Sequence, residues 1–270
     1  QLTLWAFSIQ HFAVLLFAAA SFALLSRPSA YAFAGAVVCG LLAAFSFGGG
    51  IVVAAIGLGY LVQQRHYTRA TMWLLLWGVV IVLYFRGLSL DSGTGLQPGV
   101  LERAAYLLEF LGSAATLGVF TDFIGGKQAD AALYPAAVWA ARVAGALMLC
   151  AFAWLTALRY WTRNLTVYGL LALTAISAVL AAALRGNIPY SEPFMSRYAI
   201  NSVLFAGLLL IALLDLHSHV LRPWIPAISI VTALFCMTSF IVTAPYARAH
   251  SADLRYLALL TETARHTDTV

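Results

Sequence analysis

The stretch LTVYGLLALTAISAVLAAAL, Leu165–Leu184, is the part of the sequence that best defines the fold class. It is continuously apolar and rich in Ala, and a helix that crosses the hydrocarbon core of a bilayer needs about 20 predominantly apolar residues. A polar loop with two prolines, Arg185–Ser196, follows it. The stretch therefore predicts a transmembrane helix, and the chain on either side repeats the same pattern.

Similar apolar segments fill most of the chain and are separated by short polar or glycine-containing stretches. One of them, Tyr31–Val62, is too long for a single span and is interrupted by Ser46–Gly50, whose three consecutive glycines disfavour a straight helix. We expect it to form two short helices joined by a tight turn. The other expected helices are Leu4–Leu25, Thr71–Phe85, Ala104–Phe120, Pro135–Leu158, Leu165–Leu184, Ala199–Leu214 and Trp224–Val242.

These segments predict an all-α fold, a polytopic integral membrane helix bundle of about eight transmembrane helices. The bundle is expected to span residues 1–245 and to be followed by a short amphipathic C-terminal tail, residues 246–270. No connection is long enough to hold a soluble domain. Any chemistry is therefore expected within the bundle or at its rim.

Composition excludes most other classes of protein. Of the 270 residues, 63% are hydrophobic and 9% are charged, and the mean hydropathy is +0.90. Soluble domains are roughly 45–50% apolar and about 25% charged, and no water-soluble globule of this length could bury so much apolar surface. A cytosolic enzyme, a secreted disulfide scaffold and a disordered tail are thereby excluded.

The basic residues have two interpretations. The net charge of +5 comes from 15 Lys and Arg against 10 Asp and Glu, and the Arg residues stand singly or in pairs between apolar segments. They either anchor the chain to anionic headgroups or recognise phosphate on a lipid-linked substrate. We therefore expect membrane lipids as partners and no nucleic acid. The three Cys residues are isolated within apolar runs, so no disulfide, metal site or cofactor is predicted.

Aromatic residues suggest where the membrane surface lies. Trp73 and Trp77 near the start of one helix, and the segment Arg159–Arg163 between two others, are typical of headgroup depth. Gln63–Arg69 is expected to be an interfacial loop, and Asp215–Pro223 a polar break after a helix.

Polar residues inside apolar segments are candidates for function, because a charge at the centre of a membrane helix costs roughly 2.5–3.5 kcal/mol. Gln10 and His11 lie in the first segment. They either form helix-to-helix hydrogen bonds or serve the substrate, Gln10 by binding it and His11 as a catalytic proton-transfer group. Glu109 and Arg142 each interrupt an apolar stretch. We expect them to form a structural ion pair, with a substrate-lining pair as the alternative.

The segment Arg185–Tyr198 is the most informative, because it concentrates charged and aromatic residues between two predicted helices. Arg197 and Tyr198 stand at the start of the second helix, near its positive end, which suits a phosphate or a sugar hydroxyl. The alternative is a snorkelling Arg beside an interfacial Tyr. Arg185, Arg197 and Tyr198 are therefore the candidate substrate-binding residues, and Glu192 is the candidate catalytic residue that orients a hydroxyl or assists proton transfer.

Several short motifs carry a resemblance to a known family. Leu184–Gly186, Ser196–Tyr198 and Ser202–Phe205 resemble the pattern GR, SRY and S-x-LF of bacterial polytopic inner-membrane proteins grouped with the glycosyltransferase-C-like enzymes, with Leu184 where that family has Gly. The further similar segments are Trp5–His11, Phe45–Gly50, Trp73 with Tyr84 and Phe85, and Phe110–Ser113.

The resemblance implies a multi-pass protein of the bacterial inner membrane that handles a polyprenyl-phosphate-linked sugar or a surface polysaccharide. It would act as a transferase or as the membrane half of one. Enzymes of that kind carry a catalytic Asp in the first extracytoplasmic loop, and no residue of this chain occupies that place. We therefore expect residues before Gln1 to complete the pattern.

Two other functions stay open on the sequence. One is a non-catalytic subunit that scaffolds a larger complex with other membrane protein subunits. The other is a transporter that uses the broken segment Tyr31–Val62 as its binding site.

Overall fold

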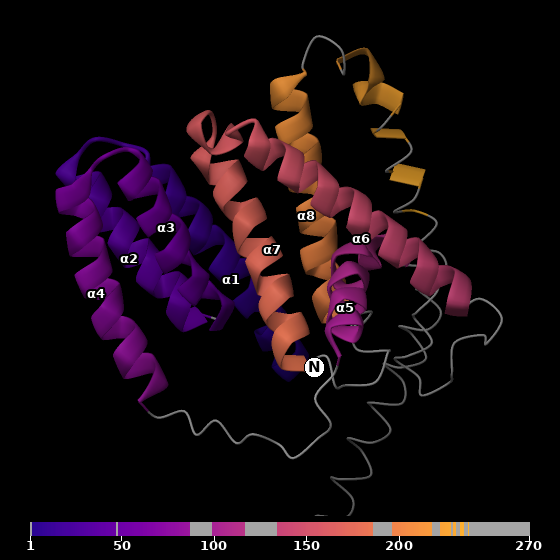
Figure 1. Ribbon diagram of the computed structural model, residues 1–270, viewed down its shortest axis with the longest axis horizontal. Coiled ribbons are helices and arrows are strands. Elements are labelled where there is room, and N and C mark those ends of the chain that lie inside the picture. Colours follow the sequence, from indigo (N-terminus) through magenta and orange to yellow (C-terminus); the bar gives the residue numbers. More distant parts are fainter. Residues whose placement is uncertain are drawn as a thin grey trace, which may run out of the picture.

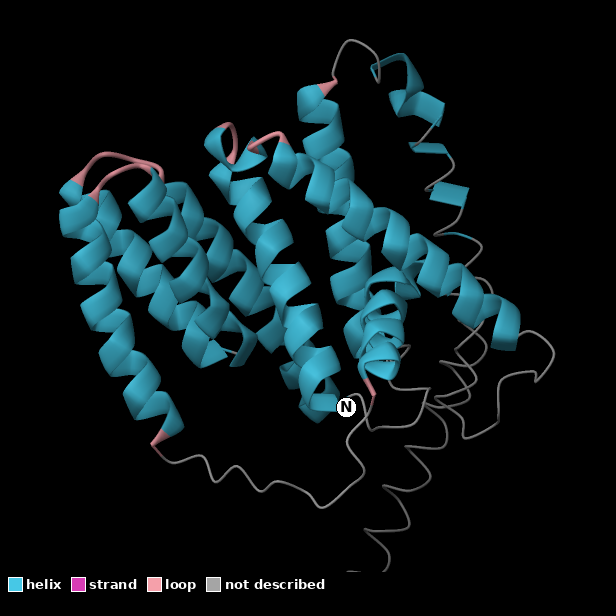
Figure 2. Cartoon of the chain, in the orientation of Figure 1, coloured by secondary structure: helices cyan, strands magenta, loops and turns pink. Residues whose placement is uncertain are grey.

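The computed structural model describes residues 2–46, 48–86, 99–116, 134–185 and 196–217, together with parts of 222–237. Within these ranges the chain is helical and contains no strand (Figure 2), so the predicted all-α class is confirmed. The α-helices are α1 (Leu2–Leu25), α2 (Ala30–Ser46), α3 (Val52–Gln63), α4 (Tyr67–Phe85), α5 (Val100–Gly112), α6 (Tyr134–Ala157), α7 (Leu165–Arg185) and α8 (Ser196–Leu216). The short 3-10 helices are η1 (Gly48–Ile51), η2 (Ser113–Thr116), η4 (Tyr160–Thr162) and η6 (Arg222–Trp224).

The predicted break inside Tyr31–Val62 is present as η1, between α2 and α3. A Cβ added at Gly50 would collide with the backbone carbonyl of Ala43 in α2. Glycine is therefore required here by close approach of two backbone segments.

Three predicted boundaries were wrong. α4 begins at Tyr67, so Tyr67–Arg69 are helical and not part of an interfacial loop. α8 continues through Leu216, so Asp215 is helical and not the start of a break. The helix expected over Ala104–Phe120 ends earlier, at Gly112, and tightens into η2. Most of the expected span Trp224–Val242, and the tail from residue 246, lie outside the described residues.

Helix α7 stands between two groups of helices (Figure 1). One hydrophobic core joins α1, α2, α3 and α4, and α7 contributes Leu165 and Leu173 to it. A second core joins α5, α6 and α8, and α7 contributes Leu171, Ala175 and Ala178 to it. Half of the most apolar 18-residue stretch within Leu165–Ala183 is buried, against 22% of the corresponding stretch within Pro135–Ala157 of α6. α7 is therefore the helix through which the two cores are joined.

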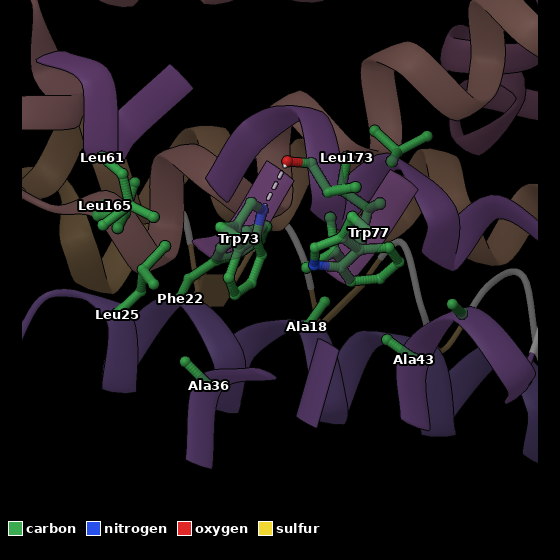
Figure 3. Packing of buried hydrophobic residues seen from close by; sticks show 14 of the residues in the cluster. Ala18, Phe22, Leu25, Ala36, Ala43, Leu61, Trp73, Trp77, Leu165 and Leu173 are labelled. Carbon is green, nitrogen blue, oxygen red and sulfur yellow. Dashed lines mark hydrogen bonds between the residues drawn. The ribbon is translucent and has the colours of Figure 1, made fainter. Parts of the chain in front are cut away.

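The first core is built around two tryptophans, so their rings face inward, and their predicted place at headgroup depth stays a prediction (Figure 3). Trp73 is fully buried and Trp77 is 2% exposed. The indole N–H of Trp73 donates to the Ala54 carbonyl at 2.9 Å. A Cβ at Gly57 would lie 2.6 Å from the Trp73 ring. The rings are buried because glycine on a neighbouring helix leaves room for them.

Helices α5 and α6 approach each other at two glycines. A Cβ at Gly112 would collide with the Ala141 carbonyl oxygen, and one at Gly145 would collide with the Leu108 carbonyl oxygen. Small residues at helix crossings allow this backbone contact, which gains van der Waals packing. The crossing sets how closely these two helices approach each other.

The outward faces of the helices are also apolar. On α4, Leu75, Val79 and Val82 are each at least 60% exposed. On α6, Val143 and Leu147 face outward in the same way. Two helices within the described residues, Pro135–Ala157 and Leu165–Ala183, are long and apolar enough to cross a membrane. The fold therefore presents apolar surface on both the inner and the outer side of its helices.

We predict that one chemical change will have opposite effects at two helical glycines. Gly145→Ala should destabilise the protein, because the new methyl group meets the α5 backbone. Gly78→Ala in α4 should leave stability unchanged or raise it, since a Cβ there meets nothing within 4 Å and Ala exceeds Gly in helix propensity by up to about 1 kcal/mol. Thermal unfolding midpoints of the purified variants measure both, and equal shifts would contradict the close crossing.

Candidate functional site

The segments predicted to bind substrate lie at one end of the bundle. Tyr160, just before α7, contacts Asp215 near the end of α8, so α7 and α8 are antiparallel and α7 ends beside the start of α8 (Figure 1). Arg185 is the last residue of α7, and Arg197 and Tyr198 are in the first turn of α8. We call this the Arg197 end and the opposite one the Asp215 end.

The structure describes the side chains of the predicted site residues only in part. The side chains of Arg185, Arg197 and Tyr198 lie outside the described residues, as does Glu192 altogether. Gln10 lies in α1 with its side chain exposed. His11 lies beside it in α1, and its side chain is outside the described residues.

Glu109 and Arg142 are brought together by the α5–α6 crossing. Arg142 Nη2 lies 2.7 Å from Glu109 Oε1, and Arg142 Nε donates to the same oxygen at 2.8 Å. The Glu109 side chain is 3% exposed and that of Arg142 is 26% exposed. The guanidinium also stands 5.3 Å from the ring centre of Trp139, an attractive cation–π geometry. The ion pair expected from the sequence is thus present, with Glu109 buried and Arg142 reaching the outer face.

Ser202 links the start of α8 to the end of α5. Its hydroxyl accepts the backbone N–H of Ala114 at 2.9 Å and donates to the backbone carbonyl of Leu111. Ser202 is fully buried. These two segments belong to the separate motifs Ser202–Phe205 and Phe110–Ser113. Both segments were singled out in the sequence as motifs, but no role for the Ser202 side chain was predicted.

Glu109, Ser113, Arg142 and Ser202 form what we call the polar junction of α5, α6 and α8. Among the described residues, the buried polar side chains are Ser21, Glu109, Ser113, Thr174 and Ser202, and three of them lie in this junction. Its α8 residue, Ser202, lies in the second turn of that helix, so the junction lies between this turn and the α5–α6 crossing.

A second polar cluster lies at the Asp215 end. Tyr160 Oη donates to Asp215 Oδ2 at 3.0 Å, and Arg163 Nη2 donates to the Asp215 backbone carbonyl at 2.6 Å. His217 stacks on Trp154 with ring centres 5.5 Å apart. Tyr160 is 1% exposed, so its side chain is buried within the protein, and its predicted place at headgroup depth stays a prediction. Its hydroxyl is buried because the Asp215 carboxylate offers it a partner there.

Arg69 ties the start of α4 to the turn between α1 and α2. Its Nη1 donates to the Arg27 carbonyl at 3.4 Å and its Nη2 donates to the Pro28 carbonyl. The guanidinium lies 5.8 Å from the Phe33 ring. This Arg therefore holds two turns together instead of pointing freely away from the bundle.

A groove of about 380 Å³ lies on the other side of α7, between α3 and α4. Its lining is almost wholly apolar and includes Ala55, Leu58, Leu74, Gly78 and Ile81. It offers hydrocarbon contacts and no charged group. None of its lining residues comes from α5, α6 or α8, so it is separate from the polar junction.

No family model, no curated protein and no solved structure matches this chain. The likeness to glycosyltransferase-C-like proteins therefore rests on the short motifs alone. The geometry of the polar junction is the second, independent basis for a proposal.

We predict that Arg142→Leu destabilises the protein more than the double substitution Glu109→Leu with Arg142→Leu. The single change leaves the Glu109 carboxylate buried without its partner, which typically costs roughly 3–5 kcal/mol. The double change removes both charges and restores apolar packing. Unfolding free energies from a double-mutant cycle measure the difference, and two additive losses would show that the pair is not coupled.

A pH prediction follows from Tyr160. Burial, followed by the hydrogen bond to the Asp215 carboxylate, raises the pKa of Tyr160 from 10.0 to about 12. The folded state thus favours the protonated phenol, and this contribution to stability is present below pH 10 and is lost as the pH rises from about 10 to about 12. Tyr160→Phe should lose about 1 kcal/mol at neutral pH and show a smaller fall across that window, measured by chemical unfolding. An unchanged pH profile would contradict the buried hydrogen bond.

Proposed function

We propose that this chain is a multi-pass protein of the bacterial inner membrane that binds a polyprenyl-phosphate-linked sugar at the Arg197 end. In this proposal it acts as a glycosyltransferase-C-like transferase or as the membrane half of one. The observation that carries the proposal is the polar junction, whose Ser202 lies about one turn beyond Arg197 on α8. Nothing else in the described part of the chain combines buried polar groups, a helix N-terminus and motif residues.

The outer surface supports the membrane environment. Leu75, Val79 and Val82 on α4 expose apolar side chains in succession along one face, and Val143 and Leu147 do the same on α6. A water-soluble monomer rarely exposes large contiguous apolar patches. In lipid these faces are solvated by acyl chains, and pairing with Glu109 offsets part of the cost of bringing the Arg142 charge to the outer face.

The contact between two motifs supports a shared site. Ser202 and Leu111 are far apart in the sequence and are joined by a hydrogen bond. This bond fixes the start of α8 against the end of α5, and Arg197 lies little more than one turn before Ser202. A guanidinium held at that position can donate two hydrogen bonds to a phosphate, which a point charge such as Lys cannot match in geometry.

The proposed reaction is sugar transfer from the lipid carrier. An acceptor hydroxyl oxygen forms a bond to the anomeric carbon of the sugar, and the bond from that carbon to the phosphate oxygen breaks. The hydroxyl proton passes to a carboxylate or imidazole base, for which Glu192 and His11 are the candidates within this chain. Polyprenyl phosphate leaves with the bonding electrons, and Arg185 and Arg197 neutralise the charge that develops on its phosphate.

We predict that Arg197→Ala weakens binding of a long-chain polyprenyl phosphate by roughly 10- to 100-fold, as loss of charge-assisted hydrogen bonds implies. Arg197→Lys should lose less. Arg65→Ala is the matched control, because Arg65 is an exposed Arg at the opposite end of the bundle. Titration of the purified proteins with polyprenyl phosphate, followed by tryptophan fluorescence, measures the affinities. Equal affinity of Arg197→Ala and wild type would overturn the assignment of the site.

A further inference from the structure

The groove between α3 and α4 takes no part in the proposed reaction and opens on the outer surface of the bundle. Leu74 and Ile81 of α4 and Ile176 of α7 line it, and these residues are 54%, 38% and 37% exposed. Its volume is about 380 Å³. An apolar cavity of about 150 Å³ already stays dry and takes up benzene. Hydrocarbon is therefore the chemistry that fits the groove.

The groove exists because two tryptophans are turned into the core. Trp73 and Trp77 line it from within and are 0% and 2% exposed. Trp73 is anchored by the hydrogen bond from its indole N–H to the Ala54 carbonyl. Beside Trp77 stands Gly78, where a Cβ would meet nothing within 4 Å. The space is thus preformed, and a ligand can enter it without rearrangement of the protein.

The groove follows α4 toward a cation. Its lining residues Leu74, Gly78 and Ile81 are spaced by four and three residues, which places them on one face of the helix. Arg86, which is exposed, follows at the end of α4, 12 residues after Leu74. At 1.5 Å per residue this is about 18 Å, close to the roughly 15 Å that one leaflet contributes to the hydrocarbon core. An acyl chain whose headgroup lies at Arg86 therefore reaches along the whole groove.

We infer that the groove binds one acyl chain of an anionic phospholipid whose phosphate contacts Arg86. This inference rests on the proposed membrane location. The groove supplies hydrocarbon contacts, and the cation beyond its end supplies the charge that complements the headgroup. A neutral lipid would gain the first contribution without the second.

The bound phospholipid is distinct from the proposed substrate. The groove lies between α3 and α4 and is lined on its inner side by Ile176 of α7, whereas the polar junction belongs to α5, α6 and α8. α4 and α7 end at the same end of the bundle (Figure 1). The lipid therefore occupies the leaflet that holds the Arg197 end, and it fills the space that α3, α4 and α7 leave open.

Photo-cross-linking of the purified protein tests the site. The probe is phosphatidylglycerol with a diazirine on one acyl chain, reconstituted in phosphatidylcholine bilayers. Ala55 and Leu58, which line the groove from α3, should be labelled, and an excess of plain phosphatidylglycerol should suppress this labelling. Val143 and Leu147 on the outer face of α6 report contact with bulk lipid. Equal labelling of both regions without competition would show bulk contact only and would overturn the site.

Filling the groove tests whether its space is what the acyl chain occupies. Gly78→Leu should lower the competed labelling by about 10-fold or more, because the new side chain displaces several methylene contacts. Gly207→Leu on α8 is the matched control and should leave the labelling unchanged. Both glycines are exposed, and a Cβ at either meets nothing within 4 Å. Unchanged labelling in Gly78→Leu would contradict the inference.

A charge variant tests the headgroup contact. Arg86→Gln should weaken competition by phosphatidylglycerol about 5-fold, the factor that one basic residue contributes near a lipid surface. Competition by phosphatidylcholine should not change. Arg27→Gln is the control, since Arg27 is an exposed Arg in the turn after α1, at the opposite end of the bundle. If Arg86→Gln keeps the full preference for phosphatidylglycerol, the assigned phosphate contact is wrong.

The outcomes separate this inference from the proposed function. Stronger competition by polyprenyl phosphate than by phosphatidylglycerol would assign the groove to the substrate carrier and overturn its assignment to a phospholipid. Normal polyprenyl phosphate binding without labelling of the groove would overturn the lipid site alone. Recovery of the chain in the soluble fraction would overturn the proposed membrane location itself.

Discussion

The close crossing of α5 and α6 is the contact on which the rest of the arrangement depends. The helices of this chain are apolar on their outer faces as well as on their buried faces, so burial of apolar surface alone does not decide which face turns inward. At this crossing, Gly112 and Gly145 determine which faces of α5 and α6 turn toward each other, because any side chain there would collide with the opposite backbone. Once the two backbones touch, Glu109 and Arg142 are within hydrogen-bonding distance.

Glycines also make room for aromatic rings in the first core. Gly57 makes room for Trp73, as Gly169 on α7 makes room for Phe22 of α1, whose ring a Cβ would approach to 2.6 Å. Polar bonds then set the register of neighbouring helices. Ser202 fixes α8 against α5 at one end, and Tyr160 fixes it against the α6–α7 turn at the other. Because α7 belongs to both cores, the two helix groups are joined along one shared helix.

Helix positions were predictable from the sequence because apolar segments of sufficient length are interrupted by few glycines, prolines and charges. The ion pair was also predictable, since Glu109 and Arg142 each stand inside an apolar stretch and opposite charges in such surroundings gain from pairing. The helix break at Ser46–Gly50 was predictable from its glycines.

The burial of aromatic residues was not predictable in the same way. Trp73, Trp77 and Tyr160 stand near helix ends, where an interfacial tryptophan or tyrosine has the same local sequence as a buried one. The difference lies in partners far along the chain: Gly57 for Trp73 and Asp215 for Tyr160. At the candidate site, motifs predicted Arg185, Arg197 and Tyr198, and the fold brings the ends of their helices together. The roles of Glu192 and His11 stay predictions.

The central claim is that the Arg197 end binds the phosphate of a lipid-linked substrate. The most direct measurement is an experimental structure of the protein purified with its native lipids in a bilayer disc. The account predicts an anionic lipid headgroup at the first turn of α8, within hydrogen-bonding distance of the Arg197 guanidinium and beside the polar junction. A protein helix or packed side chains filling that position, with no headgroup bound, would contradict it.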